Sequence, residues 1–299
     1  MTLRIALIGC VESSQIALQA LLATPAHQGR VVGVLTRQRS TFNADFVDIS
    51  TPAAAAGIPV LHVEDARDDA AQAAWLRSLA PDVVFCIGWS QLLGEAVMQV
   101  APRGVIGFHP AALPANRGRH PLIWALALGL DRTASSFFMI EAEADSGALL
   151  SQVPIDISPS DDARTLYDKV MAVVPGQLRD IVGGLSDGSL VPQPQDDARA
   201  NHWRKRSARD GLIDWRMGAI GIVNLVRALT RPYPGAEAMH QDAPVKVWKC
   251  VEEPGSADNV EPGKVLRIDG REVTVKCGQG AVRLTEHEFP QTLRAGDYL

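Results

Sequence analysis

The feature that most constrains the fold is a series of short apolar runs early in the chain, each followed by a segment with helical periodicity. Apolar runs of this length are typical of strands buried on both faces of a sheet. Strands that alternate with helices at this spacing favour a mostly parallel sheet. We therefore expect an α/β fold in which a Rossmann-like sheet carries helices on both faces. The expected strands are residues 3–8, 31–35, 58–63, 83–87 and 105–109, and the expected helices are 13–22, 64–79, 92–100 and 120–128.

The turn after the first expected strand, Gly9-Cys10-Val11-Glu12, contains a single glycine. A dinucleotide site needs a glycine-rich turn at this place, because the backbone must come close to the pyrophosphate. The sequence also lacks the G-x-x-x-x-G-K-[ST] pattern of a phosphate loop. A nicotinamide cofactor is therefore disfavoured.

A histidine and an aspartate stand at the ends of two neighbouring strands. Pro110 cannot donate to a strand ladder, so the strand should stop at His109, at the edge where open α/β sheets bind ligands. A second apolar strand, residues 136–140, leads into an acidic turn that contains Asp145. An imidazole and a carboxylate at one edge indicate an acid/base site. On spacing alone, the stronger alternative is a hydrogen-bonded loop histidine and an ordinary turn aspartate.

The second half of the chain predicts an edge strand, a long helix, a linker and a small β domain. The polar segment 184–209 carries two prolines and the basic cluster Arg204-Lys205-Arg206, which we interpret as the solvated surface of an interdomain linker. Short strands then indicate a β-barrel-like, OB-like domain. The expected domains are 1–183 and 210–299, and the expected elements are a strand at 149–157, helices at 163–181 and 217–229, and strands at 236–240, 245–250, 263–268, 272–277 and 281–284.

Composition excludes several classes of protein. The formal net charge of −5 does not suit a protein that lies along a phosphate backbone. The four cysteines are scattered, so a zinc site or a disulfide framework is not expected, and a reducing cytoplasm is the expected location. No secretory signal and no run of membrane-spanning length is present in the sequence. We therefore expect a soluble cytoplasmic protein, and a homodimer is left open.

Three sequence elements in order resemble one enzyme family. The segment HPAALP at 109–114 is followed by Arg117-Gly118 and by PLIWA at 121–125, and Asp145-Ser146-Gly147 begins 36 residues after His109. These residues resemble the formyltransferases that use 10-formyltetrahydrofolate, a family that includes methionyl-tRNA formyltransferase, glycinamide ribonucleotide formyltransferase and the N-formyltransferases of nucleotide-linked amino sugars. The segments DGLIDW at 210–215 and PYPGA at 232–236 resemble the start of the C-terminal domain in the tRNA and sugar branches.

The resemblance implies 10-formyltetrahydrofolate as the cofactor and a role in proton transfer for two residues. Formyl transfer from a folate nitrogen to an amine passes through a tetrahedral oxyanion, and protons must leave the amine and reach the folate. The resemblance implies that His109 transfers these protons and that Asp145 stabilises the charge of the histidine. The implied cofactor-binding positions are Ile87, Gly88, Trp89, Leu92, Ile140, Glu141, Ala142 and Asp145.

One position departs from the family. An asparagine that donates to the formyl oxygen usually stands two residues before the histidine, and here that position is Gly107. Loss of such a donor costs ~3–4 kcal/mol of transition-state stabilisation. Asn116 is our first candidate for a replacement donor, with a hydrogen-bonded turn residue as the equal alternative. The substitution Gly107→Asn would restore a donor only if the strand leaves room for the side chain.

The expected function is formyl transfer from 10-formyltetrahydrofolate to a primary amine, with a nucleotide-linked amino sugar as the favoured acceptor. Methionyl-tRNA is the first alternative. The loop at 36–45 holds only Arg37 and Arg39, however, and lacks the long basic insertion of the tRNA enzymes. A second alternative is a weak or inactive folate-binding or amine-binding protein, because of Gly107. We expect no metal and no membrane partner.

Overall fold

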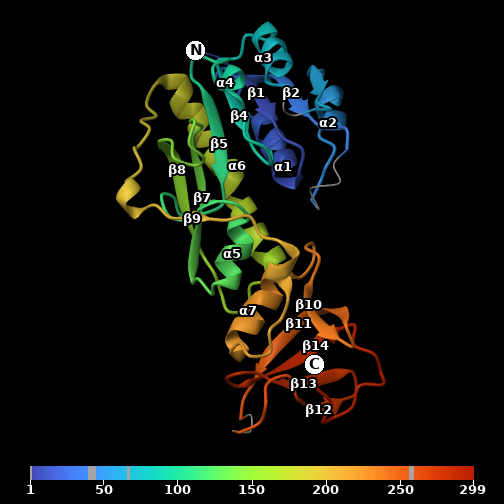
Figure 1. Ribbon diagram of the computed structural model, residues 1–299. Helices are drawn as coiled ribbons and strands as arrows, with labels where there is room; N and C mark the ends of the chain where they lie inside the picture. The colour runs from blue at the N-terminus through green and yellow to red at the C-terminus, as the bar shows by residue number, and fades with distance from the viewer. Residues whose placement is uncertain (1, 40–44, 66–67, 256–258) are drawn as a thin grey trace. The chain divides into compact units, whose positions relative to one another are not determined.

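The computed structural model describes residues 2–39, 45–65, 68–255 and 259–299. The chain forms two compact units whose segments interleave in sequence (Figure 1). Unit 1 comprises Met1–Gly118, Ala134–Ile155 and Lys169–His202, and unit 2 comprises Arg119–Thr133, Asp156–Asp168 and Trp203–Leu299. The predicted boundaries at 183 and 210 follow sequence order, and the interleaved units differ from them because 119–133 and 156–168 belong to the compact unit that also holds the C-terminal segment.

Unit 1 contains a seven-stranded sheet in the order β3-β2-β1-β4-β5-β7-β8. The first five strands in this order are parallel, and β7 joins β5 in the antiparallel sense. This confirms the mostly parallel Rossmann-like sheet, with β8 at its edge. The strands are β1 Leu3–Ile8, β2 Gly29–Thr36, β3 Val60–His62, β4 Val83–Cys86, β5 Val105–His109, β7 Arg132–Met139 and β8 Leu149–Asp156.

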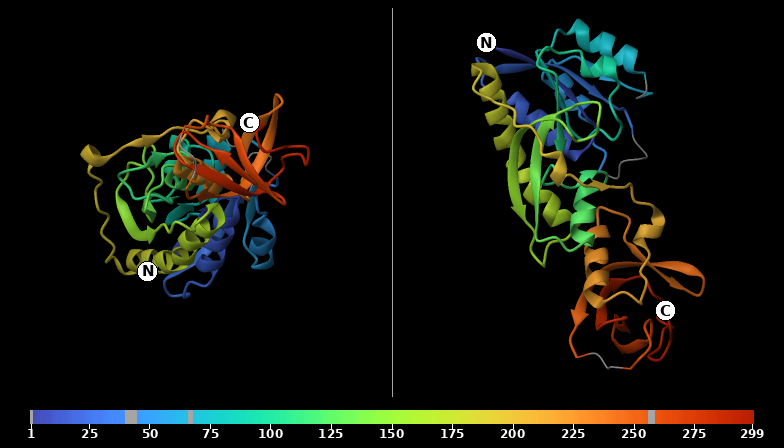
Figure 2. Two further views of the ribbon diagram at one scale, coloured as in Figure 1. Left: turned by 90° about the horizontal axis from the view of Figure 1, so that it is seen from below. Right: turned by 60° about the vertical axis from the view of Figure 1, so that its left-hand side comes forward.

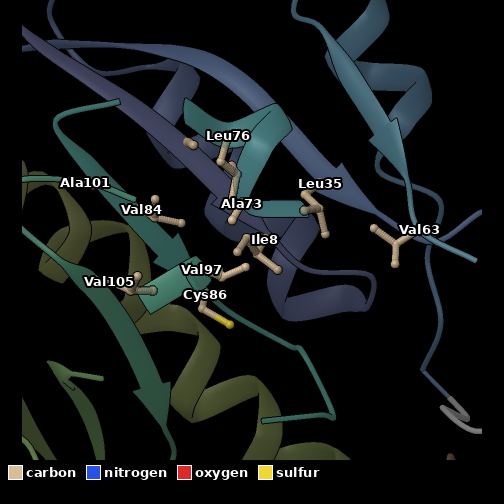
Figure 3. Packing of buried hydrophobic residues seen from close by; sticks show 11 residues of the cluster. Ile8, Leu35, Val63, Ala73, Leu76, Val84, Cys86, Val97, Ala101 and Val105 are labelled. Carbon is tan, nitrogen blue, oxygen red and sulfur yellow. The ribbon is translucent and has the colours of Figure 1, made fainter. Parts of the chain in front are cut away.

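One face of this sheet is covered by α3 and α4. Figure 3 shows Ile8, Leu35 and Val84 from three strands pointing toward Ala73 and Leu76 of α3. Burial of such side chains stabilises the fold by about 1.5–3 kcal/mol each. The Asp69 carboxylate accepts from the backbone N–H of Ala96 at 2.8 Å, which fixes the start of α4. The helices of the first half are α1 Glu12–Leu22, α2 Ser50–Ala55, α3 Asp69–Ser78, α4 Glu95–Met98 and α5 Pro121–Ala127.

The long helix α6, Ala163–Asp187, contributes to the other face. A side chain at Gly29 would meet both Ile5 of β1 and Val182 of α6, so helix and sheet are in close contact there. Gln177 of α6 donates to the Ser135 carbonyl at 3.0 Å and to the Ser151 hydroxyl at 2.8 Å. The helix therefore ties β7 to β8.

Unit 2 holds a five-stranded antiparallel sheet in the order β10-β11-β14-β13-β12, orange to red in Figure 2. This confirms the small C-terminal β domain. Helix α7, Ala219–Leu229, packs against β11 and α5. The strands are β10 Ala236–His240, β11 Ala243–Glu253, β12 Val265–Asp269, β13 Glu272–Lys276 and β14 Ala281–His287.

Several predicted element ends are corrected by the structure. The long helix ends at Asp187, past 181, because Gly188 directly after it has a φ of +80°, the left-handed conformation that commonly ends a helix. The helix expected at 92–100 is limited to α4, and α3 begins at Asp69. Parts of the predicted loop at 36–45 and of the helix expected from 64 fall on 40–44 and 66–67, outside the described residues.

The described residues contain neither a membrane-spanning helix nor a cluster of metal ligands. Among residues 2–39, 45–65, 68–255 and 259–299, no helix is long and apolar enough to cross a membrane. Within the same ranges, no group of three or more histidine, cysteine, aspartate or glutamate side chains is arranged to hold a metal ion.

Candidate active site

Strand β5 ends at His109, and the loop that follows is fastened to the neighbouring strands. The Ser136 hydroxyl of β7 donates to the carbonyl of Ala111 at 2.6 Å. Gln152 of β8 donates to Ser136 Oγ and to the carbonyl of Leu113, each at 2.9 Å. Strands β7 and β8 therefore fix the backbone that leaves the carboxyl end of β5.

The His109 imidazole lies between a carbonyl and a carboxylate. Its residue is 5% exposed, and its Nε2 lies 2.8 Å from the carbonyl oxygen of Asn116. A carbonyl can only accept a hydrogen bond, so we assign the proton of the neutral ring to Nε2. Nδ1 then carries the lone pair and faces Asp145 Oδ2 at 3.7 Å, a distance longer than a hydrogen bond. Nδ1 is thus the nitrogen that is open to a proton, next to a carboxylate that stabilises a cation.

Asp145 holds this position with a backbone conformation that is costly for a residue other than glycine. Its φ is +59°, in the left-handed region. Its Oδ2 accepts from the N–H of Gly118 at 2.8 Å. A side chain at Gly147 would come within 1.9 Å of the Met139 carbonyl oxygen, so the turn needs glycine there. The acidic turn is therefore packed tightly onto the end of β7.

Asn116 lies beside the imidazole through its backbone. Its carbonyl binds His109, its N–H donates to Asn201 Oδ1 at 2.6 Å, and its φ is +66°, a conformation that asparagine tolerates well. The loop thus folds Asn116 back to His109. Its side chain as an oxyanion donor stays a prediction.

A segment that sequence reasoning assigned to the linker runs along this site. We call residues 193–203 the strap; it is yellow to orange in Figure 1. Gln193 exchanges two backbone hydrogen bonds with Leu149, at 2.7 and 2.8 Å. At the other end of the strap, β9 (His202–Trp203) pairs with β6 (Arg117–Gly118). The prolines at 192 and 194, which favour extended backbone, were the available signal for a rigid segment.

The strap binds a buried cation next to the acidic turn. Arg117 is 1% exposed and is the largest fully buried side chain of the described residues. Its guanidinium donates to Gln195 Oε1 at 3.0 Å and to Asp197 Oδ1 at 2.7 Å, and Glu143 lies 3.8 Å away. A buried guanidinium requires such partners, because an unpaired buried charge is strongly destabilising.

The comparisons with known proteins decide the family. Residues 3–178 match the family described as "Formyl transferase", and residues 205–299 match "Formyl transferase, C-terminal domain".

The chain belongs to the formyl transferase family. This confirms the resemblance, the fold class and the prediction of a transferase enzyme. The family uses 10-formyltetrahydrofolate, as expected.

Solved structures share the fold at low sequence identity. HypX from Aquifex aeolicus, solved with tetrahydrofolic acid, is 17% identical with a TM-score of 0.66, over 96% of this chain and 44% of HypX; the chain thus spans less than half of HypX. An N-formyltransferase from Helicobacter canadensis, solved with folinic acid and dTDP-3-aminofucose, is 13% identical with a TM-score of 0.72, over 96% of this chain and 100% of that one. Methionyl-tRNA formyltransferase from Clostridium thermocellum is 14% identical with a TM-score of 0.62, over 85% and 95%.

At Gly107 this formyltransferase has no room for the asparagine typical of its family. Gly107 is buried and pairs with Phe138 of β7. A Cβ there would lie 2.8 Å from Cζ of Phe138 and 2.9 Å from Cγ1 of Ile140. Two apolar side chains thus fill the space, and Gly107→Asn is not expected to restore a donor.

The proposed folate positions of the formyltransferase differ in what they can offer a ligand. Trp89 has Arg37 5.3 Å from its ring centroid, and its buried Nε1 has no hydrogen-bond partner among the described residues. Leu92 is 77% exposed. Ile87 is fully buried. Its backbone N–H donates to the Ile8 carbonyl, and its own carbonyl accepts from the Ser14 hydroxyl. An unpaired indole N–H and an exposed leucine suit an aromatic ligand with acceptor atoms.

The other positions of the proposed folate set are Gly88, Ile140, Glu141 and Ala142. Gly88 has φ +69°, and a Cβ on it would lie 2.3 Å from the Val11 side chain, so Val11 packs closely against this backbone. Ile140 is half-buried and packs on the core cluster, whereas Glu141 and Ala142 are exposed.

Two residues of the basic cluster, Arg204 and Lys205, are exposed, and Arg206 is half-buried. In unit 2, the Arg204 and Arg206 guanidinium carbons lie 5.3 and 4.6 Å from the ring centroid of Trp124. Arg204 also pairs with Asp210. The hydrogen bond from the Arg204 guanidinium holds the pKa of the Asp210 carboxyl well below its usual value. Burial, followed by the charges of Arg119, Arg206 and Lys205, lowers the pKa of His120. The cluster is therefore packed on an aromatic ring.

Proposed function

We propose that this formyltransferase moves the formyl group of 10-formyltetrahydrofolate to the primary amine of a nucleotide-linked amino sugar. The observation that carries the proposal is the buried imidazole of His109, held between the Asn116 carbonyl and the Asp145 carboxylate at the carboxyl end of β5. The sugar acceptor is supported by likeness over 100% of the length of an N-formyltransferase that was solved with dTDP-3-aminofucose.

His109 is proposed to accept the amine proton at Nδ1. With Nε2–H donated to the Asn116 carbonyl, the ring cannot turn without breaking a 2.8 Å hydrogen bond. The same nitrogen, once protonated, can return the proton to the departing group, as general acid–base catalysis requires. The residue is buried, so the charge is held in a medium where electrostatic interactions are strong.

Asp145 is proposed to stabilise the protonated ring. Its Oδ2 faces Nδ1 at 3.7 Å while also accepting from Gly118 N–H at 2.8 Å. The hydrogen bond from Gly118 fixes the carboxylate before the ring becomes charged. A small closure would turn the 3.7 Å contact into a charge-assisted hydrogen bond.

The developing negative charge on the formyl oxygen needs a donor that Gly107 does not supply. We propose the side-chain amide of Asn116, whose backbone is held on both sides by His109 and Asn201. A fixed backbone lets a short side chain act as a preorganised donor.

The bound folate would supply the formyl group. Of the proposed folate positions, Trp89 would donate from Nε1 and Leu92 would cover apolar surface. The remaining positions would contribute packing at Ile87, Gly88 and Ile140 and turn backbone at Glu141, Ala142 and Asp145.

The test is a screen of the purified protein with 10-formyltetrahydrofolate against a panel of nucleotide-linked amino sugars, with transfer followed by mass spectrometry. We expect at least one sugar to be formylated. Isothermal titration should show binding of the folate and none of NAD. Binding of NAD without folate would contradict the cofactor assignment.

Methionyl-tRNA is the second candidate acceptor, and the cations Arg119, Lys205 and Arg206 around His120 favour it. Formylation of charged initiator tRNA, with no sugar formylated, would establish this alternative. Folate binding without transfer to any acceptor would instead support a binding protein without turnover.

A further inference from the structure

The strap touches both groups that flank His109 through the side chains of two of its residues. Asn201 Oδ1 accepts from the N–H of Asn116 at 2.6 Å. Gln195 Nε2 donates to the carbonyl of Asp145 at 2.8 Å and to the carbonyl of Gly147 at 2.7 Å. The strap therefore fixes the backbone on each side of the imidazole without contacting the imidazole.

Gln195 uses the full hydrogen-bonding capacity of its amide. Its two N–H donors bind the acidic turn, and its oxygen accepts from Nε and Nη2 of Arg117 at 3.3 and 3.0 Å. Residues 191–194 and 196–199 are exposed, whereas Gln195 is half-buried. One side chain thus links a buried guanidinium to the turn that presents the carboxylate.

The turn needs such support. The left-handed backbone of Asp145 costs about 1–3 kcal/mol and persists only where the surroundings over-determine it. Gly118 holds the carboxylate, and Gln195 holds the main chain of the same residue and of Gly147. Without Gln195, two carbonyls and the Arg117 guanidinium lose a partner together.

The family match does not account for this arrangement. The two matched ranges end at 178 and begin at 205, so Gln195 lies between them. The residue belongs to a part of this chain that the family description does not cover.

We propose that Gln195 is a positioning residue for formyl transfer: it holds Asp145 in the left-handed conformation that aims its carboxylate at Nδ1 of His109. The proposal rests on the proposed role of Asp145. Misplacement of a reacting geometry by about 1 Å can lower the rate ~10²-fold.

The decisive experiment is a double-mutant cycle. Gln195→Ala removes both links, and the near-isosteric Gln195→Glu keeps an acceptor for Arg117 but loses the donors to the turn. Each is expected to lower kcat by about 10-fold or more in the wild-type background, because the Asp145 carboxylate loses its fixed position. In the Asp145→Asn background each should change kcat by less than about twofold, because its effect passes through that carboxylate.

Gln193→Ala is the matched control, because this strap residue binds Leu149 through its backbone and its side chain reaches only the Val191 carbonyl. Its kcat should equal that of the wild type. Equal losses from Gln195→Ala in both backgrounds, or no loss in either, would overturn the proposal.

A second readout separates this proposal from the proposed function. Amide hydrogen exchange over residues 141–147 should accelerate in Gln195→Ala and stay unchanged in Gln193→Ala, whether or not an acceptor has been found. Unchanged exchange in Gln195→Ala would overturn the positioning role. Absence of transfer in the wild-type protein, with exchange accelerated as expected, would count against the function alone.

Discussion

The loop at 109–118 and the strap at 193–203 hold the same pair of side chains in different ways. The loop carries the imidazole and places the Asn116 carbonyl against its Nε2. The strap binds neither the ring nor the carboxylate, and its Gln195 and Asn201 side chains bind the backbone of residues on either side. On the proposed function, the loop supplies the atoms that react. On the inference drawn above, the strap fixes where those atoms lie.

The largest effect should come from removing the reacting groups. His109→Ala and Asp145→Asn are each expected to lower kcat by ~10²–10⁴, the scale for a positioned proton-transfer group. The KM for the folate should change much less in His109→Ala. Steady-state kinetics on the true acceptor measure both. Ser146→Ala, whose hydroxyl binds only the turn carbonyl of Glu143, is the control. Near wild-type turnover in both variants would place the reacting groups elsewhere.

The next effect tests whether the loop also supplies the oxyanion donor. Asn116→Gly removes the amide while keeping a left-handed backbone without steric cost. It should lower kcat and kcat/KM by a similar factor of about 10², the mark of an interaction made in the transition state.

Asn116→Ala serves as the comparison for this substitution, because it also strains the backbone that binds His109. If Asn116→Gly is fully active and Asn116→Ala is not, the loop acts through its main chain, and the side-chain donor is refuted.

A smaller effect should follow from filling the space at Gly107. Gly107→Asn is expected to lower the free energy of unfolding by about 1–3 kcal/mol, because its Cβ would overlap Phe138 and Ile140. It should also give no gain in kcat. Urea denaturation measures the first and kinetics the second. Gly57→Asn, at a left-handed position with open space, is the control. A stable variant with raised kcat would show that Phe138 and Ile140 can move aside for the asparagine, and it would contradict this prediction.

The smallest effect concerns His120, two residues after the end of the loop in sequence. Burial and the cations Arg119, Arg206 and Lys205 lower its pKa below the unfolded value of 6.5, with Asp210 opposing them. The unfolded chain therefore binds the proton first as the pH falls through 6.5, and stability is lost until the folded pKa is passed.

His120→Asn, which tolerates the same positive φ, should lose less stability between pH 7 and pH 5 than the wild type. Thermal unfolding at the two pH values measures this. An equal loss in both proteins would show that His120 carries no part of the acid response.

The loop could be predicted because its signals are local. Pro110 ends the strand directly after His109, and the acidic turn closes with a glycine that the packing on Met139 requires. Each of these features follows from one residue and its immediate neighbours. The strands of the parallel part could likewise be inferred, since each buried strand reads as an apolar run, but such a run does not give the order of the strands in the sheet.

The strap could not be predicted because its partners are far away in sequence. Gln195 binds Arg117 across 78 positions, and its own surroundings of proline and aspartate are the composition of a linker. The filling of the space at Gly107 also depends on the register between β5 and β7, which no local pattern reveals.

The late place of Gln195 in the chain has a consequence for the order of assembly. The ribosome releases the sheet strands and the two side chains proposed to react before it releases Gln195, the residue proposed to hold the acidic turn. Closing a loop of this length costs only slightly more entropy than closing a short one, so the delay affects timing far more than final stability. A nascent chain that has reached the end of β8 therefore carries His109 and Asp145 but lacks the contact that fixes their geometry, and formyl transfer should begin only after the strap has emerged.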